Sequence, residues 1–323
     1  MAPPPLRWDS ERLHVLDQTA LPFEQRELVL ATAGEVADAI RRLAVRGAPL
    51  IGVAAGYGLA MAAVAGDDVD AAAALLRDAR PTAVNLAWAV DRVREAAGAG
   101  PDAARAEAER IHAAEDAASA AIADAGSQLL AGVRTVLTHC NTGALAAGGQ
   151  GTALAVVRAL HGVRVLATET RPLLQGARLT AWELREAGVP YELVVDAAAP
   201  GLIAGGEVDA VVTGCDRVAA NGDVANKVGT YGLALAAHAA GIPFVAAGPS
   251  SSIDLDLPSG DAIEIEERAG DEVREALGAL LTVPGTTCRN PAFDVTPAAL
   301  VWALVTEKGA ARPVTGETVA HVA

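Results

Sequence analysis

Aromatic side chains are scarce in this chain. Only 3% of its 323 residues are Phe, Trp or Tyr, although 52% are hydrophobic. Alanine and glycine make up much of the apolar share, so we expect a core in which small side chains pack closely. Length and hydrophobic content together indicate a globular protein of two domains or one large domain.

Basic side chains are also in deficit. The chain has 25 Lys and Arg against 40 Asp and Glu, which gives a formal net charge of −15. Nucleic acid attracts proteins through its phosphates, so this charge argues against nucleic acid as a partner. An anionic small molecule remains compatible with it, because a pocket can be basic while the surface is acidic.

Cysteine is rare as well. The three cysteines, Cys140, Cys215 and Cys288, include no Cys-x-x-Cys pair. This spacing gives neither a zinc site nor a disulfide framework. No other cluster of metal-ligating residues is evident, so we expect no metal and no other cofactor.

One uncharged stretch, residues 47–66, is long enough to raise the question of a membrane span. It consists mostly of Ala and Gly and stands alone, so we interpret it as a buried helix in which Gly52 and Gly56 let a neighbour approach. Met1 to Pro5 has neither the charged region nor the apolar core of a signal peptide. We therefore expect a cytoplasmic protein without membrane association.

The order of the predicted elements changes near residue 126. Before it, short strands at residues 6–8, 13–16 and 27–30 precede helical patterns from residue 33 to about 124. After it, helices alternate with strands predicted at residues 134–138, 163–167, 191–195, 208–213 and 243–247. Such a succession predicts a parallel, doubly wound sheet with right-handed connections.

The predicted fold class is therefore α/β. A small N-terminal domain of short antiparallel strands plus helices is expected at residues 1–125, and a Rossmann-like doubly wound parallel sheet domain at residues 126–323. Near the end we expect an extended segment at residues 291–297, a last helix at residues 298–306 and a loose tail after Gly309.

Polar and reactive side chains follow the predicted strands. The fourth strand leads into Cys215-Asp216-Arg217, then a tight turn at Asn221-Gly222 and the pair Asn226-Lys227. The other four strands are followed by His139 to Gly143, Glu169 to Pro172, Asp196, and Gly248 to Ser251. Open parallel sheets bind ligands at the carboxyl ends of their strands, so a binding crevice is predicted there. Taken singly, Asp216 is more simply a helix cap and Lys227 a solvated charge.

A nucleotide site is one alternative for this edge. Gly148 to Gly151 opens the helix after the first strand and Glu169 ends the second strand, as in a dinucleotide site. However, no Gly-x-Gly-x-x-Gly directly follows the strand, and polar residues 139–142 occupy the turn that should face a pyrophosphate. We therefore favour another ligand.

Phosphate binding has better candidates in the N-terminal half. Pro49 suits the first turn of a helix, which puts the amides of Gly47 and Ala48 near its positive end. Arg46 would add a charged fork, and Arg80 stands at another break before a helix.

Longer motifs carry a resemblance to a known family. They are RGAP and IGVA within residues 46–54, RPTAVNL at 80–86, THCNTGAL at 138–145, TETRPLLQGARLTAWEL at 168–184 and GCDRVAANGDVANKVGTY at 214–231. In this order they resemble the methylthioribose-1-phosphate isomerase family. That family is similar in fold to the regulatory subunits of the initiation-factor nucleotide-exchange complex and to archaeal ribose-1,5-bisphosphate isomerase.

The resemblance implies an aldose–ketose isomerase of methionine salvage, which converts 5-methylthioribose 1-phosphate to 5-methylthioribulose 1-phosphate. It also implies a homodimer. Carried onto this chain, it makes Asp216 the acid and Cys140 the second catalytic or transition-state-stabilising group. It gives the binding of the substrate to Arg46, Gly47, Ala48, Arg80, Gln175, Asn226 and Lys227. Three positions depart from the family pattern, and they concern the shape of the pocket near the methylthio end: Cys215, Gln150 and Leu173.

The residue types suit this chemistry. The anomeric oxygen of an aldose 1-phosphate is esterified, so ring opening needs a proton delivered to the ring oxygen. Asp216 can supply it near neutrality if burial raises its pKa. Two routes for moving hydrogen from C2 to C1 stay open. Cys140 acts as a base through an enediolate, or a hydride shifts directly in a dry pocket that Cys140 shapes.

Two other functions also stay open. One is a related isomerase that acts on ribose 1,5-bisphosphate or a 5-deoxypentose 1-phosphate, and a bisphosphate would require a second basic pocket. The other is a non-catalytic regulatory subunit that binds a sugar phosphate or a nucleotide. The presence of both Cys140 and Asp216 argues against the regulatory role.

Overall fold

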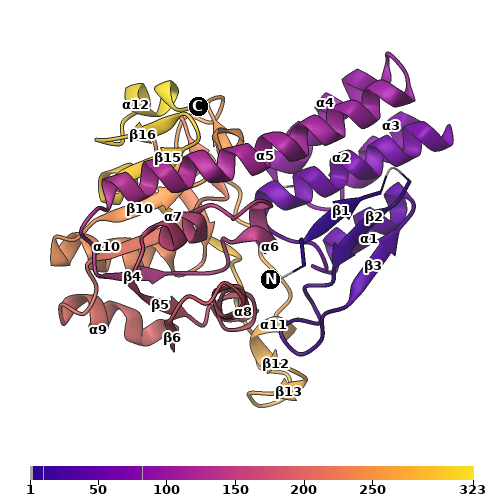
Figure 1. The fold of residues 1–323 in the computed structure, drawn as a ribbon. Coiled ribbons are helices and arrows are strands. Elements are labelled where there is room, and N and C mark those ends of the chain that lie inside the picture. The colour runs from indigo at the N-terminus through magenta and orange to yellow at the C-terminus, as the bar shows by residue number, and fades with distance from the viewer. Residues whose placement is uncertain (1–2, 10, 82) are drawn as a thin grey trace.

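A three-stranded antiparallel sheet and a layer of helices form the N-terminal part of the protein, indigo to purple in Figure 1. The computed structural model describes residues 3–9, 11–81 and 83–323, so Met1, Ala2 and Thr82 of the segments discussed above lie outside the described residues. The strands are those that the sequence predicts: β1 (Leu6–Trp8), β2 (Leu13–Leu16) and β3 (Glu27–Leu30). The helices are α1 (Ala33–Arg41), α2 (Ala48–Ala65), α3 (Val69–Arg77), α4 (Val84–Ala97) and α5 (Pro101–Leu129).

Helix α2 forms the centre of this part. It is long and apolar enough to cross a membrane, but 83% of it is buried inside the protein. A Cβ atom on Gly52 would lie 2.8 Å from the carbonyl oxygen of Asn85, so glycine is what lets α4 approach α2 so closely. The prediction of a buried helix with a close neighbour is confirmed.

The second part is built on a seven-stranded sheet. The strand order is β16-β15-β10-β7-β4-β5-β6, and all neighbours are parallel except β15 and β16. From β4 the chain proceeds to β5 and β6 on one side, then to β7, β10 and β15 on the other, so strand order reverses between β4 and β7. The strands are β4 (Thr135–Thr138), β5 (Arg164–Thr168), β6 (Tyr191–Val194), β7 (Ala210–Gly214), β10 (Phe244–Ala247), β15 (Ala303–Thr306) and β16 (Gly309–Ala311). The predicted doubly wound sheet is confirmed.

Helices cover both faces of this sheet. Alternate residues of β4 point to opposite faces, so Val136 joins the core under α5 and α7, whereas Leu137 joins the core under α9 and α10. The connecting helices are α6 (Ala144–Ala147), α7 (Ala153–Ala159), a π-helical turn (Gly176–Thr180) that leads into α8 (Ala181–Glu186), α9 (Ala199–Ala204) and α10 (Thr230–Ala240).

Helix α5 belongs to both parts of the molecule. Its first half places Ala104, Ala108 and Ile111 in the N-terminal core, and its second half places Ile122 in the core beside the large sheet. Figure 1 shows α5 running from the large sheet into the N-terminal layer of helices. The boundary predicted between residues 125 and 126 falls inside this helix.

Two predictions about the end of the chain are wrong. Residues 298–306 do not form a helix: a single 3₁₀ turn (Ala298–Leu300) precedes strand β15. The tail is not loose, because β16 pairs with β15 and α12 (Gly316–His321) buries Val319 completely. A short apolar run bounded by turns is compatible with a buried strand as well as with a helix. Here the run pairs with β10 in the sheet, so it forms a strand.

A small second sheet follows β7 and carries part of the predicted site. Its order is β11-β8-β9-β14, with β8 (Arg217–Ala219), β9 (Val224–Lys227), β11 (Ile253–Asp254) and β14 (Phe293–Thr296). The predicted turn at Asn221-Gly222 joins β8 to β9, and Gly222 has φ +92°. Between β11 and β14 the chain forms α11 (Asp271–Arg274) and the hairpin of β12 (Glu275–Ala276) and β13 (Ala279–Leu280).

Candidate active site

The carboxyl ends of β4 and β7 open onto one cavity. This is the point where strand order reverses, which is where doubly wound sheets bind ligands. The structure brings all nine residues of the predicted site to the wall of this cavity: Arg46, Gly47, Ala48, Arg80, Cys140, Gln175, Asp216, Asn226 and Lys227.

Cys140 stands directly after β4 in a strained conformation. Its φ of +63° lies in the left-handed region, which a residue with a Cβ rarely adopts. Two hydrogen bonds hold it there: its N–H donates to Thr170 Oγ1 at 2.9 Å, and its carbonyl accepts from Thr180 Oγ1 at 2.6 Å. Backbone strain that is fixed in this way concentrates at functional sites.

The N-terminus of α2 supplies a second wall. The guanidinium of Arg46 donates to the side-chain and main-chain oxygens of Asn141, at 3.2 and 2.9 Å, which anchors it beside Cys140. Gly47 has φ +94°, and a Cβ at this position would overlap the backbone of Ala146. The first turn of an 18-residue helix therefore directs its free amides to the cavity, as an anion requires.

Asp216 follows β7 and faces the cavity. Its N–H donates to the carbonyl of Ala225 at 2.9 Å, so the loop is pinned to β9 and the residue caps no helix. Burial raises the pKa of the carboxyl, and the charges of Lys227, Arg46 and Arg80 oppose that rise. A carboxyl whose pKa is raised holds its proton at higher pH than an ordinary aspartic acid does.

Lys227 comes to the cavity on strand β9. It is only 9% exposed, and its Nζ donates to the carbonyl of Ala292 at 3.0 Å and lies 4.9 Å above the ring of Phe293. Burial lowers the pKa of this ammonium. No carboxylate among the described residues lies within salt-bridge distance of it. A buried ammonium without such a partner suits an anionic ligand. Its neighbour Asn226 is buried and donates to Thr230 Oγ1 at 2.9 Å.

Two lining side chains have polar atoms without partners. The Nε of Arg80 and the Oε1 of Gln175 are buried, and neither has a hydrogen bond within the described part of the chain. Such atoms are uncommon in folded proteins and need an explanation. Both residues lie on the cavity wall, so a polar ligand can supply the missing partners.

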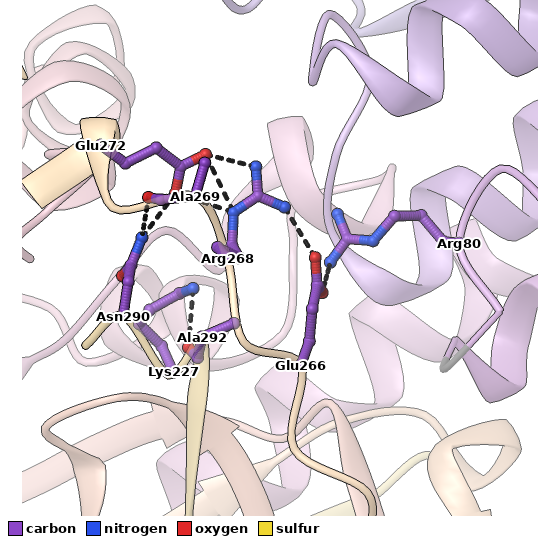
Figure 2. A network of polar contacts seen from close by, with 8 residues as sticks. All are labelled: Arg80, Lys227, Glu266, Arg268, Ala269, Glu272, Asn290 and Ala292. Atoms are coloured by element: carbon purple, nitrogen blue, oxygen red, sulfur yellow. Dashed lines mark hydrogen bonds and ion pairs between the residues drawn. The ribbon is translucent and has the colours of Figure 1, made fainter. Parts of the chain in front are cut away.

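The cavity is basic although the protein is acidic. Its charged lining residues are Arg46, Arg80, Arg217, Lys227, Arg268, Asp216 and Glu264. Of these residues, Arg80 is bound to Glu266 at 2.8 Å and Arg268 is bound to Glu266 and Glu272 (Figure 2). The excess of positive charge around Asp216 is what the binding of an anion requires.

Sequence reasoning did not identify Arg268, Glu264, Ile263 or Phe293 as lining residues. Ile263, Glu264 and Arg268 come from the segment between β11 and β14, whose mixed charges and lack of periodicity indicate only a solvated loop, and Phe293 is the first residue of β14. Of the three positions that depart from the family pattern, Cys215 and Leu173 line the cavity and Gln150 does not. Burial raises the pKa of the Cys215 thiol to about 12, so this cysteine is protonated at neutral pH.

The glycines considered above for a nucleotide site, within Gly148 to Gly151, pack against neighbouring residues. A Cβ on Gly151 would overlap the backbone at Thr142, and one on Gly149 would lie 2.9 Å from Ser119 Cβ. These glycines therefore seat the loop against its neighbours and do not face the cavity. Among the residues described, no group of three or more His, Cys, Asp and Glu side chains is arranged to hold a metal.

Comparison with known proteins gives close relatives. Residues 44–313 match the Initiation factor 2 subunit family. The chain is 51% identical over 319 residues to methylthioribose-1-phosphate isomerase of Parasynechococcus marenigrum (strain WH8102), which covers 96% of this chain and 95% of that protein. The crystal structure of 5-methylthioribose 1-phosphate isomerase from Pyrococcus horikoshii OT3 superposes with a TM-score of 0.91 at 38% identity, covering 99% of this chain and 96% of that one. That of translation initiation factor eIF-2B, subunit delta, from A. fulgidus has a TM-score of 0.85 at 36% identity, covering 98% and 99%.

Proposed function

The chain belongs to the initiation factor 2 subunit family and, within it, to the methylthioribose-1-phosphate isomerases, and from this membership we propose how its cavity works. It is an aldose–ketose isomerase that converts 5-methylthioribose 1-phosphate to 5-methylthioribulose 1-phosphate in methionine salvage. The observation that supports the proposed mechanism best is the meeting of Cys140 and Asp216 in one basic cavity.

Asp216 acts as the general acid that opens the sugar ring. In its protonated form it donates its proton to the ring oxygen, and the bond from C1 to that oxygen breaks. Burial supports this role because it raises the pKa of the carboxyl. Ring opening leaves an electron-poor C1 that still carries the phosphate ester.

Hydrogen then moves from C2 to C1. In a hydride shift, C2 gives its hydrogen with both electrons to C1, and the proton of the C2 hydroxyl returns to the carboxylate of Asp216. In the enediolate route, Cys140 removes the C2 proton as a thiolate and the electrons of that C–H bond form a C1=C2 double bond. The thiol then returns the proton to C1, while the C2 hydroxyl gives its proton to the carboxylate of Asp216. Lys227 and Cys140 both line the cavity, so a cation stands in the same site as the thiol that the second route uses.

The remaining residues hold the substrate. Arg46, Arg80 and Lys227 provide charge for the phosphate, and the amides of Gly47 and Ala48 provide the positive end of α2. Gln175 and Asn226 are amides that suit sugar hydroxyls, and the unpartnered Oε1 of Gln175 can accept a hydrogen bond from one.

We also propose a cytoplasmic homodimer. Tyr231 and Leu235 lie one turn apart on α10 and are 40% and 41% exposed, which suits a contact between two copies. All three cysteines are free, as is usual in a reducing compartment. Light scattering should give twice the chain mass for the wild type, and Leu235→Glu should lower it.

Incubation with two substrates tests the function. We expect wild-type protein to convert methylthioribose 1-phosphate to the ketose, followed by NMR, with a much higher kcat/KM than ribose 1,5-bisphosphate. The reverse preference would assign the enzyme to the bisphosphate. Binding without turnover of either compound would favour a regulatory role.

A further inference from the structure

Arg268 lines the cavity but has no place in the roles proposed above. It lies in the segment between β11 and β14, almost two hundred residues from Arg80, and its side chain is 18% exposed. A guanidinium at the wall of a phosphate site needs an account, because it is charged at every physiological pH.

One carboxylate links Arg268 to Arg80. Glu266 Oε2 accepts from Arg80 NH2 at 2.8 Å, and Glu266 Oε1 accepts from Arg268 NH1 at 2.7 Å (Figure 2). Glu266 is absent from the lining of the cavity, whereas both arginines are part of it. The carboxylate therefore lies behind the two guanidinium groups and between them.

A second carboxylate fixes the other side of Arg268. Glu272 accepts from Arg268 Nε at 2.8 and 3.0 Å and from NH2 at 2.5 Å, and it also accepts from Asn290 Nδ2 at 3.0 Å. Asn290 is itself only 2% exposed. Arg268 is thus held from two sides, and one N–H on each of NH1 and NH2 has no partner within the described residues.

The arrangement is more specific than a surface ion pair. Two guanidinium groups repel each other, and a shared carboxylate allows them to stay together on one wall. Paired arginines can bind phosphate oxygens through parallel hydrogen bonds, which a single lysine cannot do. If the contacts of Glu266 with Arg80 and Arg268 served only to fasten the segment to the N-terminal part, neither arginine would need to face the cavity.

We propose that Arg268 is a further substrate-binding residue, which contacts the phosphate beside Arg80, and that Glu266 is a positioning residue that orients both guanidinium groups. This inference rests on the proposed function, since it names the group that the arginines bind. It adds an arginine from the C-terminal part to a phosphate site to which the N-terminal part contributes Arg46 and Arg80.

Four variants of the full chain test the proposal. Arg268→Ala should raise KM at least tenfold with kcat changed less, because the phosphate is present in ground and transition states alike. Arg268→Lys keeps the positive charge but loses the paired N–H donors of the guanidinium, so its KM should lie between those of the wild type and Arg268→Ala. Glu266→Gln should also raise KM. The control is Arg289→Ala, since Arg289 lies on the same segment, pairs with Glu267, is 87% exposed and does not line the cavity.

Protection by inorganic phosphate gives a readout without turnover. Phosphate should raise the melting temperature of the wild type and of Arg289→Ala, and should raise that of Arg268→Ala clearly less. Wild-type KM and wild-type phosphate protection in both Arg268 variants would overturn the inference, even if their melting temperatures fall. A wild type that binds phosphate but does not turn over the pentose phosphate would overturn the proposed function, while the phosphate comparison would still decide the role of Arg268.

Discussion

The side chains at the junction of β4 and β7 differ in how far the sequence reveals them. Asp216 can be suspected from its place after a buried strand. The strain at Cys140 cannot, because its φ of +63° results from hydrogen bonds to Thr170 and Thr180, which lie 30 and 40 residues away. Thr170 also has φ +63°. Residues in this region cost of order 1 kcal/mol or more each, so the fold must hold them there for a reason.

Asp216→Asn should abolish turnover and leave the fold and substrate binding nearly intact. The amide has the size of the carboxyl but cannot donate the proton that opens the ring. Loss of a general acid usually lowers the rate by about two to four decades. Steady-state kinetics measures the loss of turnover, and a phosphate-protection assay measures ligand binding separately. A near wild-type kcat in Asp216→Asn would mean that Asp216 is not the general acid.

The pH dependence of kcat should report the ionisation of the Asp216 carboxyl. The pKa of Asp216 is raised in the folded protein, mainly by burial. Since the acid must be protonated, kcat should be constant below this raised pKa and should fall as pH rises through it. A kcat that increases over that range would mean that Asp216 works as a base from the start.

Lys227→Ala should chiefly raise KM, because the proposed role of the ammonium is to bind a phosphate that is present throughout the reaction. A charged hydrogen bond is worth about 1.5–3 kcal/mol, which is roughly tenfold or more in KM. Lys308 is the other lysine of the chain and is exposed, so Lys308→Ala is the matched control. Equal KM values for Lys227→Ala and Lys308→Ala would mean that Lys227 does not bind the phosphate.

At the scale of elements, the short strands and the alternation of strands with helices were predictable, and the last apolar run was not. The strands β1 to β3 and the alternation from β4 to β10 follow from residue patterns alone. The run from 298 to 306 was predicted as a helix, yet Ala303 to Thr306 is fully buried between β10 and β16. Tertiary context outweighs propensity in such a short run.

The candidate site shows the same division. The nine predicted residues lie in motifs that resemble a family, and they share one cavity. Arg268 and Glu266 were missed because their segment has neither period nor motif, and its role arises only from contacts with Arg80, 186 residues away from Glu266 in sequence. Such contacts depend on the complete fold and leave no local pattern.

The start of α2 gives a test at this scale. Gly47→Ala should destabilise the protein by several kcal/mol and should weaken phosphate binding, because the new Cβ would overlap the backbone of Ala146. Gly66→Ala at the other end of α2 is the control: its φ is +77°, but a Cβ there would meet nothing within 4 Å. It should cost only the left-handed strain, about 1–2 kcal/mol. Urea unfolding measures both, and equal losses would show that the close approach at Gly47 is unimportant.

At the scale of the whole molecule, α5 makes the two parts depend on each other. Its residues Ile111 and Ile122 are buried in different cores, and a Cβ on Gly126 would overlap Val156 of α7. Neither part can keep its core when α5 unwinds. The two sequence-predicted domains should therefore unfold in one transition.

Tryptophan fluorescence can test this coupling. Trp8 and Trp88 report on the N-terminal part and Trp302 on the large sheet, whereas Trp182 reports on the contact between the two parts because it is buried with Leu16 and Leu21. In a variant with Trp8, Trp88 and Trp182 replaced by Phe, and in its counterpart with Trp182 and Trp302 replaced, fluorescence and far-UV circular dichroism should give the same urea midpoint. Two separated midpoints within either variant would show that the parts unfold independently.

The place of β15 also has a consequence for the nascent chain. This strand lies inside the sheet between β10 and β16, and α5 packs against both β15 and β16. During synthesis, α5 and β10 leave the ribosome before β15 has been made, so their apolar faces stay uncovered until β15 is translated. Until then the unpaired edge of β10 is a site where a chaperone would bind or a second nascent chain would pair.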